Sequence, residues 1–237
     1  MEAMIGDESL PLPALSGRGR QRLANGRGKS RFALGPGWFS IRLMSITPRI
    51  LVFGGSLRRD SFNQKLAAIA AEGARSAGAQ VTVIALRDFP LPIFDEDLET
   101  AVGKPDPAIK LKALFREHHG LIIASPEYNS SVTAALKNAI DWVSRADSDD
   151  EPALSALSGK SAVLCATSPG ALGALRGLVH LRSILGNIGI TVLPDQVAVG
   201  GAYQAFKEDG SLADEKQAAR VKNLGASLAR HLSKLLA

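Results

Sequence analysis

Three polar residues near the start of a predicted helix could bind a phosphate group. Ser56, Arg58 and Ser61 follow an apolar run at residues 50–53 and then two glycines. Hydroxyl groups can donate hydrogen bonds to phosphate oxygens, and a guanidinium presents a fork of N–H donors that matches a phosphate. The glycines let the backbone turn sharply after the strand. The spacing therefore predicts an anion site in a strand-turn-helix unit.

The sequence also predicts how this helix begins. Ser61 is a favoured N-cap residue, and Gln64 completes a capping-box pattern before an amphipathic stretch at residues 62–77. The first turn of a helix leaves N–H groups unpaired and carries partial positive charge, so it attracts anions. An ordinary surface turn with a well-capped helix is the alternative. Neither the G-x-G-x-x-G pattern nor the Walker spacing is met by this sequence.

The composition is typical of one globular domain. The chain has 237 residues, of which 46% are hydrophobic and 22% charged, so it can bury one sizeable core. Its single cysteine, Cys165, lies in an apolar run, and we expect a buried thiol in a reducing cytoplasm. No apolar run reaches the roughly 20 residues that a membrane-spanning helix needs, so we expect no membrane partner.

The net charge of +5 is unevenly distributed. Residues 1–43 hold seven basic and three acidic residues, which leaves about +1 for the remainder. We therefore expect no specific nucleic-acid partner. Since the first segment is rich in Gly, Pro and Arg, we interpret residues 1–47 as a flexible basic extension and residues 48–237 as the domain. An over-extended translation start, an expression remnant and a transit peptide are alternatives for the extension.

Short apolar runs alternate with helical patterns from Arg49 onward. Strands are predicted at residues 50–53, 81–86, 121–125, 162–167 and 190–199, and helices at residues 62–77, 107–118, 132–144, 172–188 and 213–236. This alternation indicates an α/β fold, a three-layer sandwich whose five-stranded parallel sheet has helices on both faces. In a sheet of order 2-1-3-4-5, ligands bind beyond the carboxyl ends of the first and third strands. The loop after the third strand should then form the second half of the site.

Two more loops are predicted at this edge of the sheet. After the third strand come Pro126, Glu127, Tyr128 and Asn129. Proline and asparagine favour a tight turn, and tyrosine offers a flat face, so this loop could line a planar heterocycle. An ordinary turn with a packed tyrosine is the alternative. Thr167 and Ser168 begin a third loop of small residues, and the three loops together predict a crevice.

Three motifs in this order resemble those of a known family. They are Gly55-Ser56-Leu57-Arg58 with Ser61-Phe62-Asn63, then Pro126-Glu127-Tyr128-Asn129, then Leu136-Lys137-Asn138-Ala139-Ile140-Asp141-Trp142. The sequence is similar to the NADPH-dependent FMN reductase family of flavodoxin-like proteins, and within it to bacterial soluble quinone and chromate reductases. The likeness covers about residues 48–235 and includes Arg176 and the run His180-Leu181-Arg182.

The resemblance implies a flavodoxin-like fold and noncovalently bound FMN. The first loop would hold the FMN phosphate through Ser56, Arg58, Ser61 and Asn63, with Phe62 beside them, and residues 126–129 would line the isoalloxazine ring. Thr167 and Ser168 match a third flavin-contacting loop. The cofactor-binding set that it implies is Ser56, Arg58, Ser61, Phe62, Asn63, Pro126, Glu127, Tyr128, Asn129, Thr167 and Ser168. In the third loop, Pro169, Ala171 and Leu172 depart from the small polar residues that the family leads us to expect.

The activity that the resemblance implies is that of an oxidoreductase. NAD(P)H would pass a hydride through bound FMN to a quinone, azo dye, flavin or chromate in a ping-pong mechanism. Such chemistry needs no metal, and the sequence offers no histidines at metal-binding spacing. An FMN electron carrier and a flavin-based redox sensor are the alternatives, although a nearly neutral domain disfavours a carrier, which is usually acidic. The family also leads us to expect a homodimer or homotetramer.

An anionic substrate would also need a positive side chain near the flavin. Arg145, just past the helix at residues 132–144, is our candidate, followed by Arg59 and Arg176. The alternative for Arg145 is a cation that complements the helix C-terminus. Trp142 and Val143 could serve a subunit interface or the core.

Overall fold

The structure, a computed structural model, describes residues 46–237. The predicted basic extension at residues 1–47 lies outside them, apart from its last two residues. The elements of the described chain are β1 (Arg49–Gly54), α1 (Phe62–Ser76), β2 (Gln80–Val83), η1 (Leu86–Asp88), α2 (Glu96–Val102), α3 (Asp106–Glu117), β3 (Gly120–Ala124), β4 (Glu127–Tyr128), β5 (Ser131–Val132), α4 (Ala134–Ser144), β6 (Ser161–Thr167), α5 (Leu175–Asn187), β7 (Thr191–Val199), α6 (Ala202–Ala205) and α7 (Glu215–Leu235). None of the helices in this part of the chain is long and apolar enough to cross a membrane.

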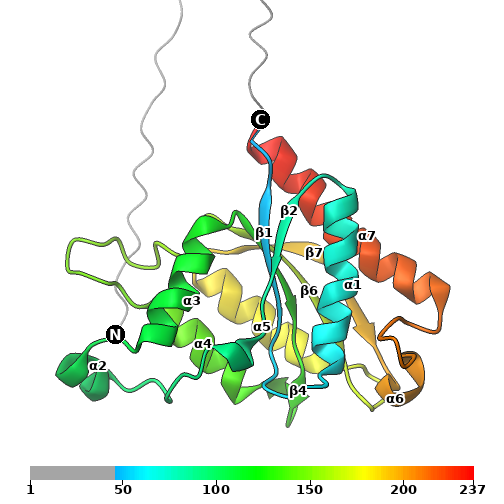
Figure 1. Cartoon of the computed structure of the whole chain (residues 1–237), viewed down its shortest axis with the longest axis horizontal. Helices are drawn as coiled ribbons and strands as arrows, with labels where there is room; N and C mark the ends of the chain where they lie inside the picture. The colour runs from blue at the N-terminus through cyan, green and yellow to red at the C-terminus, as the bar shows by residue number, and fades with distance from the viewer. Residues whose placement is uncertain (1–45) are drawn as a thin grey trace, which may run out of the picture. The chain divides into compact units, whose positions relative to one another are not determined.

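Five strands form one parallel sheet in the order β2-β1-β3-β6-β7. Along the chain β6 and β7 are its fourth and fifth strands, so the predicted order 2-1-3-4-5 is confirmed. α1 and α7 cover one face of the sheet, and α3, α4 and α5 cover the other (Figure 1). The strands β1, β3 and β6 are buried on both faces, which explains why the sequence shows them as continuous apolar runs. The three-layer α/β architecture is as predicted.

Glycines bring α1 and α7 into backbone contact. A Cβ atom on Gly225 of α7 would overlap the carbonyl oxygen of Ala70, and one on Gly73 of α1 would overlap that of Lys222. The two helices can lie this close only because glycine has no side chain. Figure 1 shows them side by side over one face of the sheet.

Some predicted boundaries differ from those in the structure. The helix predicted from residue 172 begins at Leu175, because Gly173 and Ala174 have left-handed φ angles of 59° and 67°. The strand predicted at residues 81–86 ends at Val83, because a short 3-10 turn begins at Leu86.

Four short features are missing from the sequence prediction: the 3-10 turn η1, α2, α6 and the hairpin of β4 and β5. The hairpin occupies the start of the helix predicted at residues 132–144. That helix begins at Ala134, where Thr133 is its N-cap and accepts a hydrogen bond from the Leu136 N–H.

Candidate functional site

The first loop turns between β1 and α1 in a narrow space, where glycines avoid close contacts. A Cβ on Gly54 would lie 2.9 Å from the Gln64 nitrogen, and one on Gly55 would lie 2.9 Å from Leu136 Cδ2. The Thr133 hydroxyl donates to the Gly55 carbonyl over 2.6 Å, which fastens the loop to the start of α4. Sequence reasoning missed this contact of Thr133.

Ser61 caps α1 as predicted, but Gln64 does not complete the capping box. The Ser61 hydroxyl accepts the Gln64 N–H at 3.3 Å. The Gln64 side chain instead accepts the Gly54 N–H at 2.8 Å and donates to the Ile84 carbonyl at 2.9 Å. The Gly54 N–H at the end of β1 and the Ile84 carbonyl just after β2 both pair with the Gln64 amide. This amide therefore connects the two strands to α1 and does not bond the backbone N–H of Ser61.

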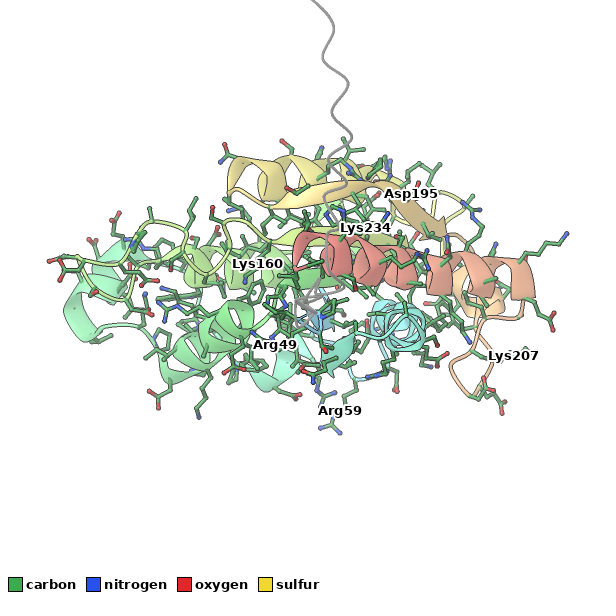
Figure 2. The ribbon with its side chains drawn as sticks, turned by 90° about the horizontal axis from the view of Figure 1, so that it is seen from above. Arg49, Arg59, Lys160, Asp195, Lys207 and Lys234 are labelled. Atoms are coloured by element: carbon green, nitrogen blue, oxygen red, sulfur yellow. The ribbon has the colours of Figure 1, made fainter. Side chains whose placement is uncertain are left out.

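The first loop gathers donors that fit a phosphate group. Ser56 and Ser61 are buried, and the Arg58 side chain borders the same hollow. Within residues 46–237 the Arg58 guanidinium takes part in no hydrogen bond or ion pair, while its backbone N–H donates to the Ser56 hydroxyl at 3.2 Å. The first N–H groups of α1 have no partner inside the helix. Hydroxyls, helix N–H groups and a guanidinium converging on one hollow are suited to an anion. Arg59, by contrast, extends away from the fold (Figure 2).

Asn63 has a different role from the one that the family resemblance implies. Its amide donates to the Thr167 carbonyl at 2.8 Å and accepts the Thr167 N–H at 3.0 Å. This reciprocal pair holds the first loop to the third and leaves little of the amide for a phosphate. Phe62, next to it, packs against Tyr203 and Phe206, with ring centroids 5.6 and 5.3 Å away.

The second loop is a tight turn, as predicted, and its two arms pair as a hairpin. β4 and β5 pair in antiparallel fashion around Asn129 and Ser130, whose φ angles are 51° and 67°. Positive φ at both central residues is the geometry of a type I′ turn, which asparagine tolerates and serine adopts at a cost. Tyr128 stands 55% exposed at this turn.

The carboxylate of Glu127 is engaged by α5. It receives hydrogen bonds from the Arg176 side chain at 2.8 Å and from the Gly177 N–H at 2.9 Å, both on α5. Burial alone would raise the pKa of Glu127, but the Gly177 amide and the Arg176 guanidinium outweigh it and lower the pKa. The expectation that Glu127 lines the ring therefore applies at most to its backbone and aliphatic stem.

The polar groups of the third loop are mainly engaged within the fold. The Thr167 hydroxyl donates to the Val199 carbonyl at 2.8 Å, and its N–H is held by Asn63. The Ser168 hydroxyl makes only a long contact of 3.5 Å, with the Gly170 carbonyl. Of these two residues, Ser168 is the one with a side chain available to a ligand.

The three loops enclose one crevice, of about 480 Å³ including its open mouth. Every residue of the predicted cofactor-binding set except Asn129 lines it, and Pro169 joins them. β4 and the start of α1 lie at the same edge of the sheet, the lower edge in Figure 1. A larger groove, of about 880 Å³, lies on the other side of Leu57 and is bordered by Phe89, Leu91 and Ala135. Its lining is mainly apolar, so the smaller crevice is the better anion site.

The structure does not bring Arg145 to this crevice. Arg145 follows α4, whose first turn contacts the first loop, and the 11 residues of that helix span about 16 Å. Its guanidinium pairs with Glu99 at 2.7 Å and Glu96 at 3.4 Å and lies over the Phe94 ring. A helix that follows a parallel strand runs back along the sheet, so its C-terminus lies far from the ligand edge. The prediction of Arg145 as a contact for an anionic substrate is wrong for this chain's own crevice.

Other predicted residues have structural roles. Trp142 is fully buried and donates to the Pro92 carbonyl at 2.8 Å, and Val143 is buried beside it, so both belong to the core. Arg182 donates to the Val192 and Leu193 carbonyls at 3.3 and 2.8 Å, where the pairing of β7 with β6 is irregular. Cys165 is fully buried, and burial raises its pKa to about 12, which makes it a poor nucleophile.

The histidines of the predicted domain have local partners. His118 binds the Leu114 carbonyl at 2.6 Å and the Thr82 hydroxyl at 2.8 Å, and His180 contacts the Ser131 hydroxyl at 2.9 Å. Within residues 46–237 there is no group of three or more His, Cys, Asp or Glu side chains that could hold a metal ion.

Comparison with known proteins agrees with the fold and the motifs. The family model for NADPH-dependent FMN reductases matches residues 48–204. A quinone reductase of Escherichia coli K12 is 35% identical over 162 residues, which cover 68% of this chain and 81% of that protein. An NAD(P)H-dependent FMN reductase of Pseudomonas aeruginosa is 34% identical over 174 residues, 73% of this chain and 89% of that protein.

Solved structures give the same result. The flavoenzyme NAD(P)H:acceptor oxidoreductase FerB of Paracoccus denitrificans superposes with a TM-score of 0.66 at 28% identity, over 79% of this chain and 98% of that one. An archaeal flavodoxin, 13% identical with a TM-score of 0.51 over 78% of this chain and 98% of its own, shares the fold alone. The chain therefore belongs to the NADPH-dependent FMN reductase family and is an oxidoreductase of flavodoxin-like fold that works with FMN and NAD(P)H.

Proposed function

We propose that the crevice between the three loops holds FMN and that the chain reduces small quinone-type acceptors there with NAD(P)H. The observation that carries the proposal is the crevice itself, where phosphate-binding donors on the first loop lie across from an exposed tyrosine on the second. Ser56, Arg58, Ser61 and the first N–H groups of α1 would hold the FMN phosphate. Pro126, Tyr128 and the hairpin backbone would border the ring, and Ser168 would approach it from the third loop.

The protein's part in this chemistry is to hold and orient the cofactor. FMN, when bound, supplies the transfer of hydride from donor to acceptor. Asn63 and Thr133 hold the first loop to its two neighbours, so the phosphate donors are in place before a ligand arrives. Such preorganisation lowers the entropic cost of binding. No side chain of the crevice is required as a nucleophile.

The names of the relatives support the acceptor class that we propose. Several are named quinone reductases, and one from a Burkholderia species is named 2-hydroxy-1,4-benzoquinone reductase, with 35% identity over 74% of its length. We propose quinones as the main acceptors and azo dyes, free flavins and chromate as secondary ones. We also propose a ping-pong order, in which NAD(P)+ leaves before the acceptor enters, so that donor and acceptor use the same flavin face in turn.

Anaerobic reduction tests the proposal. Purified protein loaded with FMN is mixed with NADPH or NADH, and the flavin absorbance near 450 nm is followed before and after benzoquinone is added. We expect rapid bleaching by at least one donor and full recovery on addition of the quinone. Absence of bleaching with both donors would favour an electron carrier. Bleaching without recovery by any acceptor of the panel would favour a redox sensor.

The oligomeric state and the compartment are also proposals. Leu175 and Val179 are exposed apolar residues on α5, 40% and 61% accessible, and lie beside the hairpin that carries Tyr128. Such a face supports self-association, and we propose a homodimer or homotetramer, which sedimentation velocity of the FMN-loaded protein would test. We also propose a cytoplasmic location, because the only cysteine of the chain leaves it without an internal disulfide. Cell fractionation would test the location.

Replacing Arg58 should weaken FMN far more than riboflavin. Arg58→Ala removes a charge-assisted hydrogen bond worth about 1.5 to 3 kcal/mol, so the Kd for FMN should rise about 10- to 150-fold. Riboflavin lacks the phosphate, and its Kd should stay unchanged. Titration of flavin fluorescence measures both constants. Arg75→Ala, at the other end of α1, is the matched control and should alter neither; an unchanged FMN affinity in Arg58→Ala would remove Arg58 from the site.

A further inference from the structure

We propose that Glu127 is a positioning residue, which fastens the β4–β5 hairpin to α5 and thereby sets the wall of the crevice that receives the flavin ring. The inference rests on the proposed function and adds a role for a carboxylate that binds α5. The element through which Glu127 acts is α5.

The contact between Glu127 and α5 is bidentate. Its Oε1 accepts from Arg176 Nε at 2.8 Å and lies 2.5 Å from a terminal nitrogen of the same guanidinium, while its Oε2 accepts the Gly177 N–H at 2.9 Å. The carboxylate is 7% exposed, so water competes little for it. It also lies at the first turn of α5, where N–H groups lack helical partners and attract negative charge. This is a strong anchor for a short loop.

The hairpin needs such an anchor. Its two strands have two residues each, and a two-stranded hairpin is at best marginally stable alone. Asn129 and Ser130 both hold left-handed backbone angles without being glycine, which costs free energy that the surroundings must offset. In this hairpin the Glu127 carboxylate and the contact of Ser131 with His180 are the two side-chain links to α5.

The sequence of α5 provides for this contact at Gly177. A Cβ there would lie 3.3 Å from the Ser131 carbonyl oxygen, closer than most Cβ contacts, and 3.4 Å from the Cβ of Glu127, at van der Waals contact. Glycine thus lets the helix approach the hairpin closely enough for its N–H to reach the carboxylate. The contact is built from both sides, by Gly177 on the helix and Glu127 on the hairpin.

Glu127 is the immediate neighbour in sequence of Pro126 and Tyr128, the residues proposed to border the ring. The Glu127 carboxylate binds α5, and Pro126, Glu127 and Tyr128 all border the crevice. A hairpin that slips at Glu127 therefore moves the wall of the crevice, while the phosphate donors on the first loop stay in place.

The test separates ring contacts from phosphate contacts. Glu127→Gln keeps an acceptor for the Gly177 N–H but loses the ion pair with Arg176, and Glu127→Ala loses both. We expect the Kd values for FMN and riboflavin to rise by the same factor, about 5-fold for Gln and at least about 10-fold for Ala, so that their ratio stays that of the wild type. The near-UV and visible circular dichroism of bound flavin should change as well, because it reports the surroundings of the ring.

Two comparisons make the result decisive. Arg176→Gln, which removes the partner from the helix side, should reproduce the effect of Glu127→Gln. Glu72→Gln breaks an exposed ion pair with Lys222 on the α1–α7 side of the sheet and should leave both Kd values and the dichroism unchanged. Wild-type riboflavin affinity and dichroism in both Glu127 variants would overturn the positioning role. Loss of FMN alone would also overturn it, whereas failure of the wild type to bind FMN would refute the proposed function.

Discussion

Gly225→Ala should destabilise the protein by about 3 kcal/mol, one of the two largest effects that we expect from a single substitution. A methyl group on Gly225 would overlap the Ala70 carbonyl oxygen and lie 3.1 Å from the Ala74 nitrogen. These are backbone atoms of α1, so no side chain can rotate away and the two helices must separate. Overpacking of this kind typically costs 1 to 3 kcal/mol, and a rigid contact belongs at the upper end. The Tm of a domain of this size should fall by about 6 to 12 °C.

A second glycine offers a control of opposite sign. Gly186 lies in α5, and a Cβ there would meet no atom within 4 Å. Gly186→Ala should therefore raise stability by about 0.5 to 1 kcal/mol, since alanine favours the helix. Urea unfolding followed by circular dichroism measures both variants. Equal stability of Gly225→Ala and the wild type would mean that α1 and α7 do not approach as closely as described.

The sheet could be predicted because its sequence signal is strong. β1, β3 and β6 are covered on both faces, so their residues are apolar without interruption, and the helices between them show their own period. The first loop could also be predicted, because glycines and an N-cap serine act within a few residues of one another. Both signals come from residues close together in the sequence, so hydrophobic periodicity and turn or cap preferences are enough to predict these parts of the fold.

The second loop shows where local rules end. The β4–β5 hairpin has strands of two residues, too short for any periodicity, and its turn uses Asn129 and Ser130 without a glycine. The role of Glu127 depends on α5, which lies about 50 residues further along the chain. The pairing of Asn63 with Thr167 spans 104 residues. Contacts of this separation leave no pattern in one sequence.

The prediction that Arg145 contacts an anionic substrate was wrong, although the predicted order of strands and helices already argued against it. In a parallel α/β fold, each helix returns toward the start of the next strand, so residues at its C-terminus lie away from the ligand edge. This topology brings residues at helix starts to the ligand edge: Ser61 lines the crevice, and Thr133 contacts the first loop. Applying that rule would have excluded Arg145.

Lys112→Met should also cost about 3 kcal/mol, because Lys112 is the most buried member of a partly buried network of charges. The Lys112 ammonium on α3 is 2% exposed, donates to the Arg145 carbonyl and lies 2.9 Å from Glu151 and 3.1 Å from Asp147. Removing one partner of a buried pair typically costs 3 to 5 kcal/mol, and we expect the lower end because Lys104 and Arg116 remain beside the two carboxylates. Methionine replaces the aliphatic part of the lysine with an unbranched chain of similar length and omits the ammonium, so the loss reports the charge.

An exposed pair provides the matched control for Lys112. Lys137 lies 2.7 Å from Asp141 one turn away, but its side chain is 48% exposed. Lys137→Met should change stability by no more than about 0.5 kcal/mol, and added salt should reduce even that. Denaturant unfolding at neutral pH compares the two variants. If Lys112→Met and Lys137→Met lowered the free energy of unfolding by similarly small amounts, the charges around Lys112 would have to be solvated.

The cost of Lys112→Met should depend on pH in a defined direction. Burial alone would raise the pKa of Asp147, but Lys104 and Lys112 lower it. Burial alone would also raise the pKa of Glu151, but hydrogen bonds from Ser155, Lys112 and the Asp147 amide lower it. A carboxylate with a lowered pKa in the folded state stabilises the protein above its unfolded pKa, about 4, and loses that contribution as the pH falls through the folded value. The free energy of unfolding of the wild type should therefore exceed that of Lys112→Met by the largest amount at pH 6 to 7. This difference in stability should become smaller below about pH 4. A difference independent of pH would assign the effect of Lys112 to packing of its aliphatic chain instead of to its charge.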